Sequence, residues 1–138
     1  MRRFLMDSLP TAVSLLIIVP VGFYSKFYRG PAAAWVNDSL GGLFYVVFWC
    51  LVVFLVCPRW KPRWIAVGVL FATCLLEFLQ LWHPPFLEFL RSYFLGRTIL
   101  GTSFDWMDFP YYFIGSAIGW YWLTRLARRR TAPRHAAG

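Results

Sequence analysis

The stretch SLGGLFYVVFWCLVVFLVCP, residues 39–58, decides the fold class of this chain. It contains 20 residues and no charge. An α-helix rises 1.5 Å per residue, so about 20 apolar residues cross the hydrocarbon core of a bilayer. The stretch therefore predicts a transmembrane helix. Asn37, Asp38 and Ser39 supply the polar side chains that commonly cap the start of a helix.

The rest of the 138 residues has the same apolar character. Hydrophobic residues make up 59% of the chain and aromatic residues 21%, whereas only 14% are charged. The mean hydropathy is +0.56. Soluble domains carry about 25% charged residues, so the charges here are too few to cover a globule of this size. This composition excludes an ordinary soluble domain, a disordered chain and a disulfide scaffold.

Three further stretches lack charge over nearly a membrane thickness, if Glu77 is allowed inside one of them. Between the last two lies FLEFLRSYFL, which has an apolar face at helical spacing but is too short to span. We therefore expect an all-α polytopic membrane protein with four transmembrane helices and a short interfacial or re-entrant helix. The expected parts are a single membrane domain over 1–124, spans at about 8–25, 39–57, 64–82 and 108–124, the short helix at about 86–95, and a basic tail over 125–138.

The basic residues are distributed unevenly along this pattern. Ten of the 14 lysines and arginines lie in the N-terminus, the loop between the second and third spans, and the tail, and four lie on the other side. The positive-inside rule then predicts that both termini are cytoplasmic. We expect the basic tail to contact anionic membrane lipid, because such residues are attracted to the negative surface of the cytoplasmic leaflet. The same attraction explains the net charge of +8 without nucleic-acid binding.

Most of the acidic residues collect on the predicted outer side, together with several other polar residues. The candidate ligand-binding cluster comprises Asp38, Glu77, Gln80, Arg91, Arg97, Asp105 and Asp108.

Glu77 is the most informative member of this cluster, because a charge inside a membrane helix costs about 2.5–3.5 kcal/mol and needs a partner. Gln80 lies on the same helix face, at i+3. Two interpretations remain open. Glu77 is a ligand-contacting or proton-binding carboxyl with an amide beside it, or it forms a structural ion pair with Arg91 or Arg97 that holds the following loop.

Glycines and acidic residues shape the segment before the last span. Gly96 and Gly101 bracket residues 97–100, and we expect a non-helical loop there that packs in protein or lines a polar cavity. Asp108 is placed to cap the last helix, with Pro110 in its first turn, which leaves Asp105 freer to bind a ligand.

Gly115 and Gly119 give the last span a face of small residues. Such a face allows two helices to approach closely. We expect this packing within a monomer, with a weak homodimer through the same face as the alternative.

No metal or cofactor is expected. The three cysteines are separated by 7 and 17 residues, which fits no zinc pattern, and neither histidine is near them. A catalytic triad, a glycine-rich nucleotide loop and the HExxH motif are all missing from the sequence. We therefore assign no catalytic residue and regard an enzyme as the less favoured class.

The central part of the chain resembles the domain-of-unknown-function family numbered 2809, which comprises small bacterial integral membrane proteins. The resemblance rests on Glu77-x-x-Gln80-Leu81-Trp82, Leu90-Arg91, Leu95-Gly96-Arg97-x-x-Leu100-Gly101-x-x-Phe104-x-x-x-Asp108-x-x-x-Tyr112-x-x-Gly115. The family tends to carry Gly-Asp near the start of its second span, where this chain has Asn37-Asp38.

A looser resemblance links the chain to VanZ-like proteins, which share the Glu-x-x-Gln pair, a later Arg and a later Asp. It implies a role at the cell envelope and a location in the bacterial inner membrane. The hypothesis is a protein that binds or moves an envelope lipid or a lipid-linked glycoconjugate at its outer face, with Arg91 and Arg97 holding an anionic group. The alternatives are an enzyme acting through Glu77, Asp105 and Asp108 on a lipid-linked substrate, and a structural subunit of an envelope complex.

Overall fold

The computed structural model describes residues 2–101 and 103–132, and every regular element within them is helical. The expected all-α fold is thereby confirmed. The elements are α1 (Arg2–Phe27), α2 (Ala33–Trp35), the π-helical turn η1 (Val36–Leu40), α3 (Gly41–Val56), α4 (Pro62–Leu79), α5 (Pro85–Ser92), α6 (Phe94–Leu100) and α7 (Asp108–Thr131).

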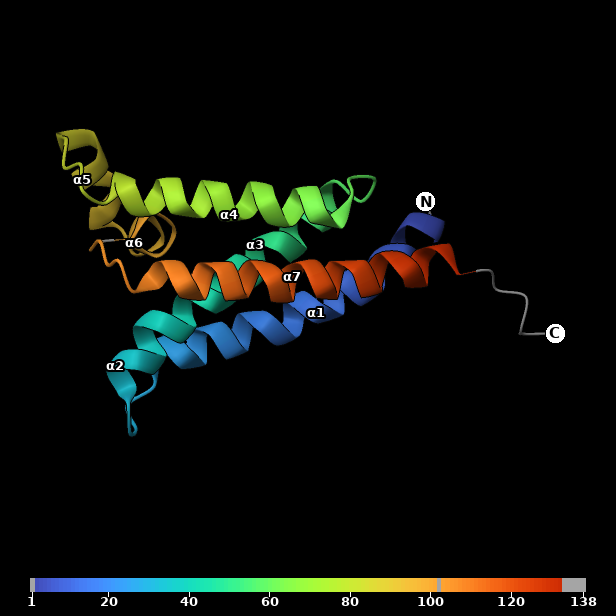
Figure 1. Cartoon of the computed structure of the whole chain (residues 1–138), viewed down its shortest axis with the longest axis horizontal. Coiled ribbons are helices and arrows are strands. Elements are labelled where there is room, and N and C mark those ends of the chain that lie inside the picture. The colour runs from blue at the N-terminus through green and yellow to red at the C-terminus, as the bar shows by residue number, and fades with distance from the viewer. Residues whose placement is uncertain (1, 102, 133–138) are drawn as a thin grey trace.

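The four long helices form a bundle in which α3 and α7 are the central pair. Figure 1 shows α1 and α4 on either side of α7, while α3 crosses behind it; both α1 and α4 pack on this pair. The start of α1, the α3–α4 connection and the end of α7 lie at one end of the bundle, which we call the basic end. The short elements α2, α5 and α6 lie at the opposite end.

Three helical segments are long and apolar enough to cross a membrane: Met6–Phe27, Ala33–Val56 and Pro62–Leu79. Helix α7 has 24 residues, but its last turns are rich in arginine, so its composition is more polar. Large apolar side chains cover the outside of the bundle, as expected for a membrane protein. Among the exposed ones are Leu16, Ile17, Phe23, Val67, Phe71, Leu75, Phe113, Ile114 and Tyr121.

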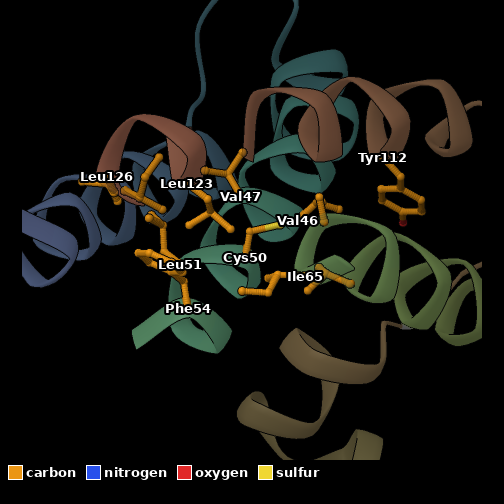
Figure 2. Close-up of a cluster of buried hydrophobic side chains, with 12 residues drawn as sticks. Val46, Val47, Cys50, Leu51, Phe54, Ile65, Tyr112, Leu123 and Leu126 are labelled. Atoms are coloured by element: carbon orange, nitrogen blue, oxygen red, sulfur yellow. The ribbon is translucent and has the colours of Figure 1, made fainter. Parts of the chain in front are cut away.

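The hydrophobic core runs along α3. Figure 2 shows the buried side chains of this helix between those of α4 and α7. The α3 members are Val46, Val47, Cys50, Leu51 and Phe54; α7 adds Tyr112, Leu123 and Leu126, α4 adds Ile65, Ala66 and Val69, and α1 adds Ile18.

Two glycines allow α7 to lie directly against α3. A Cβ atom built on Gly115 would lie 2.8 Å from the carbonyl oxygen of Leu43, and one built on Gly119 would lie 2.9 Å from Sγ of Cys50. Between them, the hydroxyl of Ser116 donates a hydrogen bond to the carbonyl oxygen of Ala66 in α4 (3.0 Å). The small-residue face of α7 therefore packs within the chain.

Arg130 ties α7 to two other helices at the basic end. Its Nε donates to the carbonyl oxygen of Asp7 (2.9 Å), its Nη2 donates to the hydroxyl of Thr11 (3.2 Å), and its guanidinium lies 4.4 Å from the ring centroid of Phe54. Helix α7 continues to Thr131, so residues 125–131 of the expected basic tail are helical. Residues 133–138 of the expected tail lie outside the described residues.

The expected single helix over 86–95 is also wrong, because the chain breaks it at Tyr93. This residue has extended backbone angles (φ −87°, ψ 149°), and α6 begins immediately after it. Gly96 lies against the carbonyl of Leu90, where a Cβ atom would overlap the backbone. The glycine therefore lets α6 fold back onto α5.

The expected loop over 97–100 is helical instead, and it forms the last turn of α6. Gly101 ends this helix with a positive φ of 74°, a conformation that glycine adopts without a Cβ clash.

The packing of α7 on α3 predicts opposite effects for two glycine-to-alanine substitutions. Gly115→Ala places a methyl group against backbone that cannot move without separating the helices, and such overpacking typically costs about 1–3 kcal/mol. Gly41→Ala is the matched control, because a Cβ at Gly41 meets no atom within 4 Å and alanine favours the helix. Thermal unfolding in detergent is expected to show a lower Tm for Gly115→Ala only. Equal Tm values for the two variants would contradict the close packing.

Candidate functional site

The last turn of α4 buries an acidic side chain inside the apolar bundle. Glu77 is 1% exposed, and both of its carboxylate oxygens accept hydrogen bonds. Oε2 accepts from Nε2 of Gln80 (2.9 Å) and from the hydroxyl of Tyr112 (2.6 Å). Oε1 accepts from the backbone N–H of Asp105 (2.9 Å). We call these four residues the Glu77 cluster.

The cluster joins three separate parts of the chain. Gln80 follows Glu77 by one helical turn, Tyr112 comes from the second turn of α7, and Asp105 belongs to the connection between α6 and α7. A carboxylate has room for about four donors, so it can connect several segments at once. Glu77 therefore fastens α4 to the start of α7 and to the connection that precedes it.

Two glycines let the surrounding backbone approach the cluster. A Cβ atom on Gly101 would lie 2.6 Å from Nε2 of Gln80, so the end of α6 rests directly on that amide. A Cβ atom on Gly42 would lie 2.8 Å from the ring of Tyr112. Through these contacts the cluster also touches α3, which makes it the meeting point of four elements.

The hydrogen-bond roles suit an ionised Glu77. The Asp105 N–H and the Gln80 NH₂ can only donate, and the Tyr112 hydroxyl donates its single proton to the same carboxylate. Hydrogen bonds to an ionised acceptor are short and about twice as strong as neutral ones. The negative charge is thus stabilised by three donors, and no arginine or lysine forms an ion pair with it among the described residues.

Aromatic rings cover the outer edge of the Glu77 cluster. Phe78 lies next to Glu77 on α4, and it stacks on Phe104 and Trp106 of the connection and on Phe109 of α7, with ring centroids 5.5–6.1 Å apart. Phe109 in turn contacts the ring of Tyr112 (6.1 Å). These rings exclude water from the hydrogen bonds and so strengthen them.

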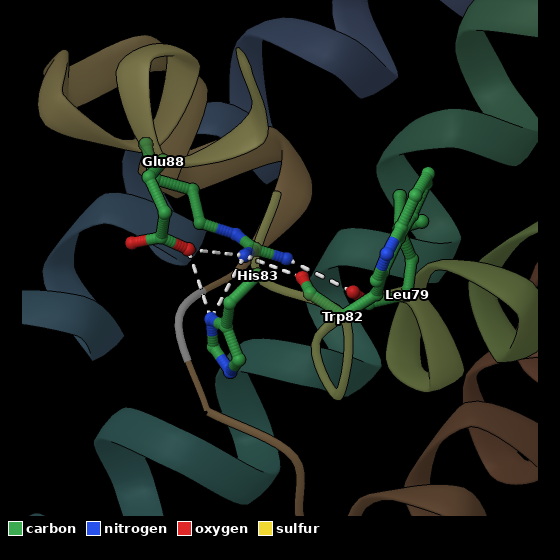
Figure 3. A network of polar contacts seen from close by, with 5 residues as sticks. Leu79, Trp82, His83 and Glu88 are labelled. Atoms are coloured by element: carbon green, nitrogen blue, oxygen red, sulfur yellow. Dashed lines mark hydrogen bonds and ion pairs between the residues drawn. The ribbon is translucent and has the colours of Figure 1, made fainter. Parts of the chain in front are cut away.

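The expected ion pair between Glu77 and Arg91 or Arg97 is wrong. Arg91 is buried at the C-terminal end of α4, where its guanidinium donates to the carbonyl oxygens of Leu79 and Trp82 (both 3.0 Å) and to Oε1 of Glu88 (2.7 Å). Figure 3 shows these carbonyls facing the charged network. The last carbonyls of a helix lack partners within it and attract cations. Arg91 therefore anchors α5 onto α4.

Glu88 and His83 complete this anchor on its exposed side. Nδ1 of His83 lies 2.9 Å from Oε1 of Glu88. The hydrogen bond to His83 and that to Arg91 lower the pKa of the Glu88 carboxyl below its ordinary value. The two Nη groups of Arg91 are engaged by these partners, and its Nε is buried without a hydrogen-bond partner within the described residues. Arg91 therefore offers no exposed donor to a ligand.

The remaining candidate residues face outward around the cluster. Asp38 on η1, Arg97 on α6 and the carboxylate of Asp105 are exposed, whereas Asp108 is partly buried. Asp108 lies within electrostatic range of the Glu77, Asp105 and Asp38 carboxylates and of the Lys26 ammonium. The four carboxylates of Asp38, Glu77, Asp105 and Asp108 therefore lie in one region of the bundle.

Asp108 does not cap α7. The capping position belongs to Met107, which has helical backbone angles, and no side chain makes the capping hydrogen bond. Asp108 is instead the first helical residue, where its negative charge is favourable to the helix dipole. The carboxylate of Asp105 accepts the N–H of Met107 (2.9 Å) and so stabilises the turn before the helix.

The described residues contain no group of three or more His, Cys, Asp or Glu side chains placed to hold a metal ion. Glu77 is 1% exposed, and both of its carboxylate oxygens are engaged with protein donors.

The sequence-based cluster omitted Tyr112 and Gly42. Both are ordinary in a membrane helix, and neither has a charge to attract attention. The family resemblance did include Tyr112, so that motif was the signal that could have identified it.

These observations define a class: a small all-helical membrane protein in which a buried carboxylate holds the last helix connection. Residues 32–116 match the family described as "Protein of unknown function (DUF2809)", and the chain belongs to that family. The match runs from just before α2 into α7 and contains the whole Glu77 cluster together with Gly42 and Gly101. No solved structure is significantly similar to the chain.

The Glu77 cluster predicts a graded loss of stability. Glu77→Ala leaves the two buried donors of Gln80 and Tyr112 and the partly buried N–H of Asp105 without their acceptor, and each buried group costs about 1–3 kcal/mol. Tyr112→Phe removes only one donor and is expected to lower stability by about 1–3 kcal/mol, with Glu77→Gln between the two. Unfolding in detergent measures the series, with Asp38→Asn as the control because that side chain is exposed and makes no hydrogen bond or ion pair within the described residues. A Glu77→Ala variant as stable as the control would contradict this account.

Proposed function

We propose that this protein is a four-span protein of the bacterial inner membrane, with α7 as the fourth span and both termini in the cytoplasm. Three observations support the arrangement. Sixteen residues without charge run from Phe109 to Thr124. Helix α7 packs against the apolar helices α3 and α4. The basic segments of the sequence meet at one end of the bundle, where they would face the cytoplasmic leaflet.

In this arrangement α5 and α6 lie at the outer surface of the membrane. Leu87 of α5 packs inward, whereas Phe86, Phe89 and Leu90 are exposed. An amphipathic helix too short to span places such an apolar surface in the interface. We assign the pair an interfacial position.

At this outer surface the protein binds the head group of an envelope lipid or lipid-linked glycoconjugate. One observation carries the proposal. The buried carboxylate of Glu77 holds the α6–α7 connection in place, and that connection presents exposed polar groups. Binding groups must be held rigidly to be selective, and a buried, fully satisfied hydrogen-bond network supplies that rigidity. The resemblance to VanZ-like proteins supports the envelope as the source of the ligand.

The exposed groups suit a ligand that carries both phosphate and sugar. Arg97 offers a planar guanidinium, which binds phosphate with two parallel hydrogen bonds. The carboxylates of Asp38 and Asp105 accept hydrogen bonds from hydroxyl groups, and the exposed ring of Trp106 offers an apolar face. Arg91 has a positioning role in this proposal, since its guanidinium is engaged by α4 and Glu88.

Lipids that co-purify with the protein test this function. The double variant Arg97→Gln/Asp105→Asn is expected to lose at least tenfold of a retained glycolipid or lipid-linked sugar phosphate, measured by mass spectrometry after purification from native membranes. Arg29→Gln is the control, because it removes an exposed charge at the same end of the bundle. Equal retention in all three proteins would refute the head-group site, and absence of any enriched glycolipid would favour a structural subunit.

The proposed orientation predicts which engineered cysteines are accessible from which side. In a background with the three native cysteines replaced by alanine, a thiol at Ser103 is expected to react with an impermeant maleimide in intact cells. A thiol at Thr131 is expected to react only after the membrane is opened. Both positions are exposed on the bundle, so burial does not limit labelling. The reverse pattern would overturn the orientation.

A further inference from the structure

A cleft opens between α1 and α7 at the basic end of the bundle. Its volume is about 440 Å³, which is large enough for part of a lipid molecule. Helix α1 lines it with Leu9, Pro10, Val13 and Ser14, and α7 lines it with Trp122, Arg125, Leu126 and Arg129.

The inside of the cleft is apolar, because its one buried hydroxyl is already satisfied. Ser14 donates to the carbonyl oxygen of Pro10 (2.8 Å) and accepts a hydrogen bond from the indole of Trp122 (3.0 Å). The remaining wall consists largely of hydrocarbon. Leu9 and Val13 are exposed and continue into the apolar outer surface of α1 at Leu16. A hydrocarbon chain could therefore pass from the membrane into the cleft.

The mouth of the cleft carries two arginines on the same face of α7. Arg125 and Arg129 are four residues apart, a spacing that places them one helical turn apart. Both are exposed, and neither makes a hydrogen bond or ion pair within the described residues. Arg125 lies over the ring of Tyr121, with its guanidinium carbon 5.8 Å from the ring centroid.

The other arginines of α7 have different surroundings. Arg130 is engaged by α1 and Phe54, as described above. Arg128 is exposed but does not line the cleft. Arg125 and Arg129 therefore differ from Arg128 and Arg130, because they face the cleft and have no hydrogen-bond partner within the described residues.

We propose that this cleft binds one anionic glycerophospholipid of the cytoplasmic leaflet. Arg125 and Arg129 hold the phosphate, because guanidinium groups match phosphate oxygens with paired hydrogen bonds. One acyl chain lies along Leu9, Val13 and Trp122. Basic pockets between membrane helices on the cytoplasmic side are typical head-group sites.

This inference rests on the orientation proposed above and is independent of the ligand at the opposite end. A lipid is favoured over a protein partner because the cleft joins an apolar wall to a cationic mouth at the boundary of the membrane-spanning surface.

Native mass spectrometry of delipidated protein with added phosphatidylglycerol tests the site, with phosphatidylcholine as the zwitterionic comparison, because its choline cation balances the phosphate charge and competes with the arginines for it. The parent protein is expected to retain one phosphatidylglycerol, and Arg125→Gln/Arg129→Gln is expected to bind it at least tenfold more weakly. Arg59→Gln/Arg63→Gln removes the same charge from the basic end outside the cleft, and Arg128→Gln removes one charge from the same helix. Both controls are expected to bind within about twofold of the parent.

A second variant separates the cleft from general attraction to a basic surface. Val13→Trp fills the apolar part and leaves both arginines in place, so it is also expected to weaken binding at least tenfold. The lipid-free thermal stability of the arginine pair variant, expected to equal that of the parent, shows that the fold is intact. The proposal would be overturned if Arg125→Gln/Arg129→Gln bound phosphatidylglycerol as well as the parent, or if Arg59→Gln/Arg63→Gln lost as much binding as that variant. Unchanged binding by a folded Val13→Trp would also overturn it. Equal retention of phosphatidylcholine would do the same.

Discussion

A single buried carboxylate, that of Glu77, holds together the end of the bundle that lies opposite the basic end. In a chain with 14% charged residues, burying one of six acidic groups is expensive unless every oxygen finds a donor. Gln80, Tyr112 and the N–H of Asp105 meet that requirement from three parts of the chain. The positions of α6, of the connection after it and of the start of α7 all depend on this one group.

Two arginines perform comparable tasks at the two ends of the molecule. Arg91 binds backbone carbonyls at the end of α4, and Arg130 binds the carbonyl of Asp7 on α1. Arg91 satisfies carbonyls at the C-terminal end of a helix, whereas Arg130 adds a charge-assisted hydrogen bond to a carbonyl inside α1. Buried charged residues in this protein therefore connect helices to one another. Exposed ones, such as Arg97, Arg125 and Arg129, remain available to bind ligands.

The middle of the bundle is held by a different interaction. There α3 and α7 approach closely at Gly115 and Gly119, and the contact is made by shape alone. Hydrogen bonds hold the helices together at the two ends of the bundle, and close packing holds them together in the middle. Large apolar side chains therefore remain on the outside of the bundle. That division suits a membrane protein, in which the surrounding lipid supplies no hydrophobic force for helix association.

The sequence by itself determined the fold class, the approximate position of each long helix and the uneven distribution of basic residues along the chain. These follow from hydropathy and charge, which act locally or through the membrane as a whole. It also placed the amide of Gln80 beside Glu77, because i+3 residues share a helix face.

Only the tertiary structure decided which partners Glu77 has. A carboxylate accepts a hydrogen bond from an N–H or a hydroxyl as readily as it pairs with an arginine. The two partners that lie 28 and 35 positions away in the sequence meet Glu77 only after folding. For the same reason the tertiary structure decided that Arg91 closes α4 and that Tyr93 breaks the short helix. Those outcomes depend on which backbone groups are left without partners when the helices pack, and no local pattern encodes that.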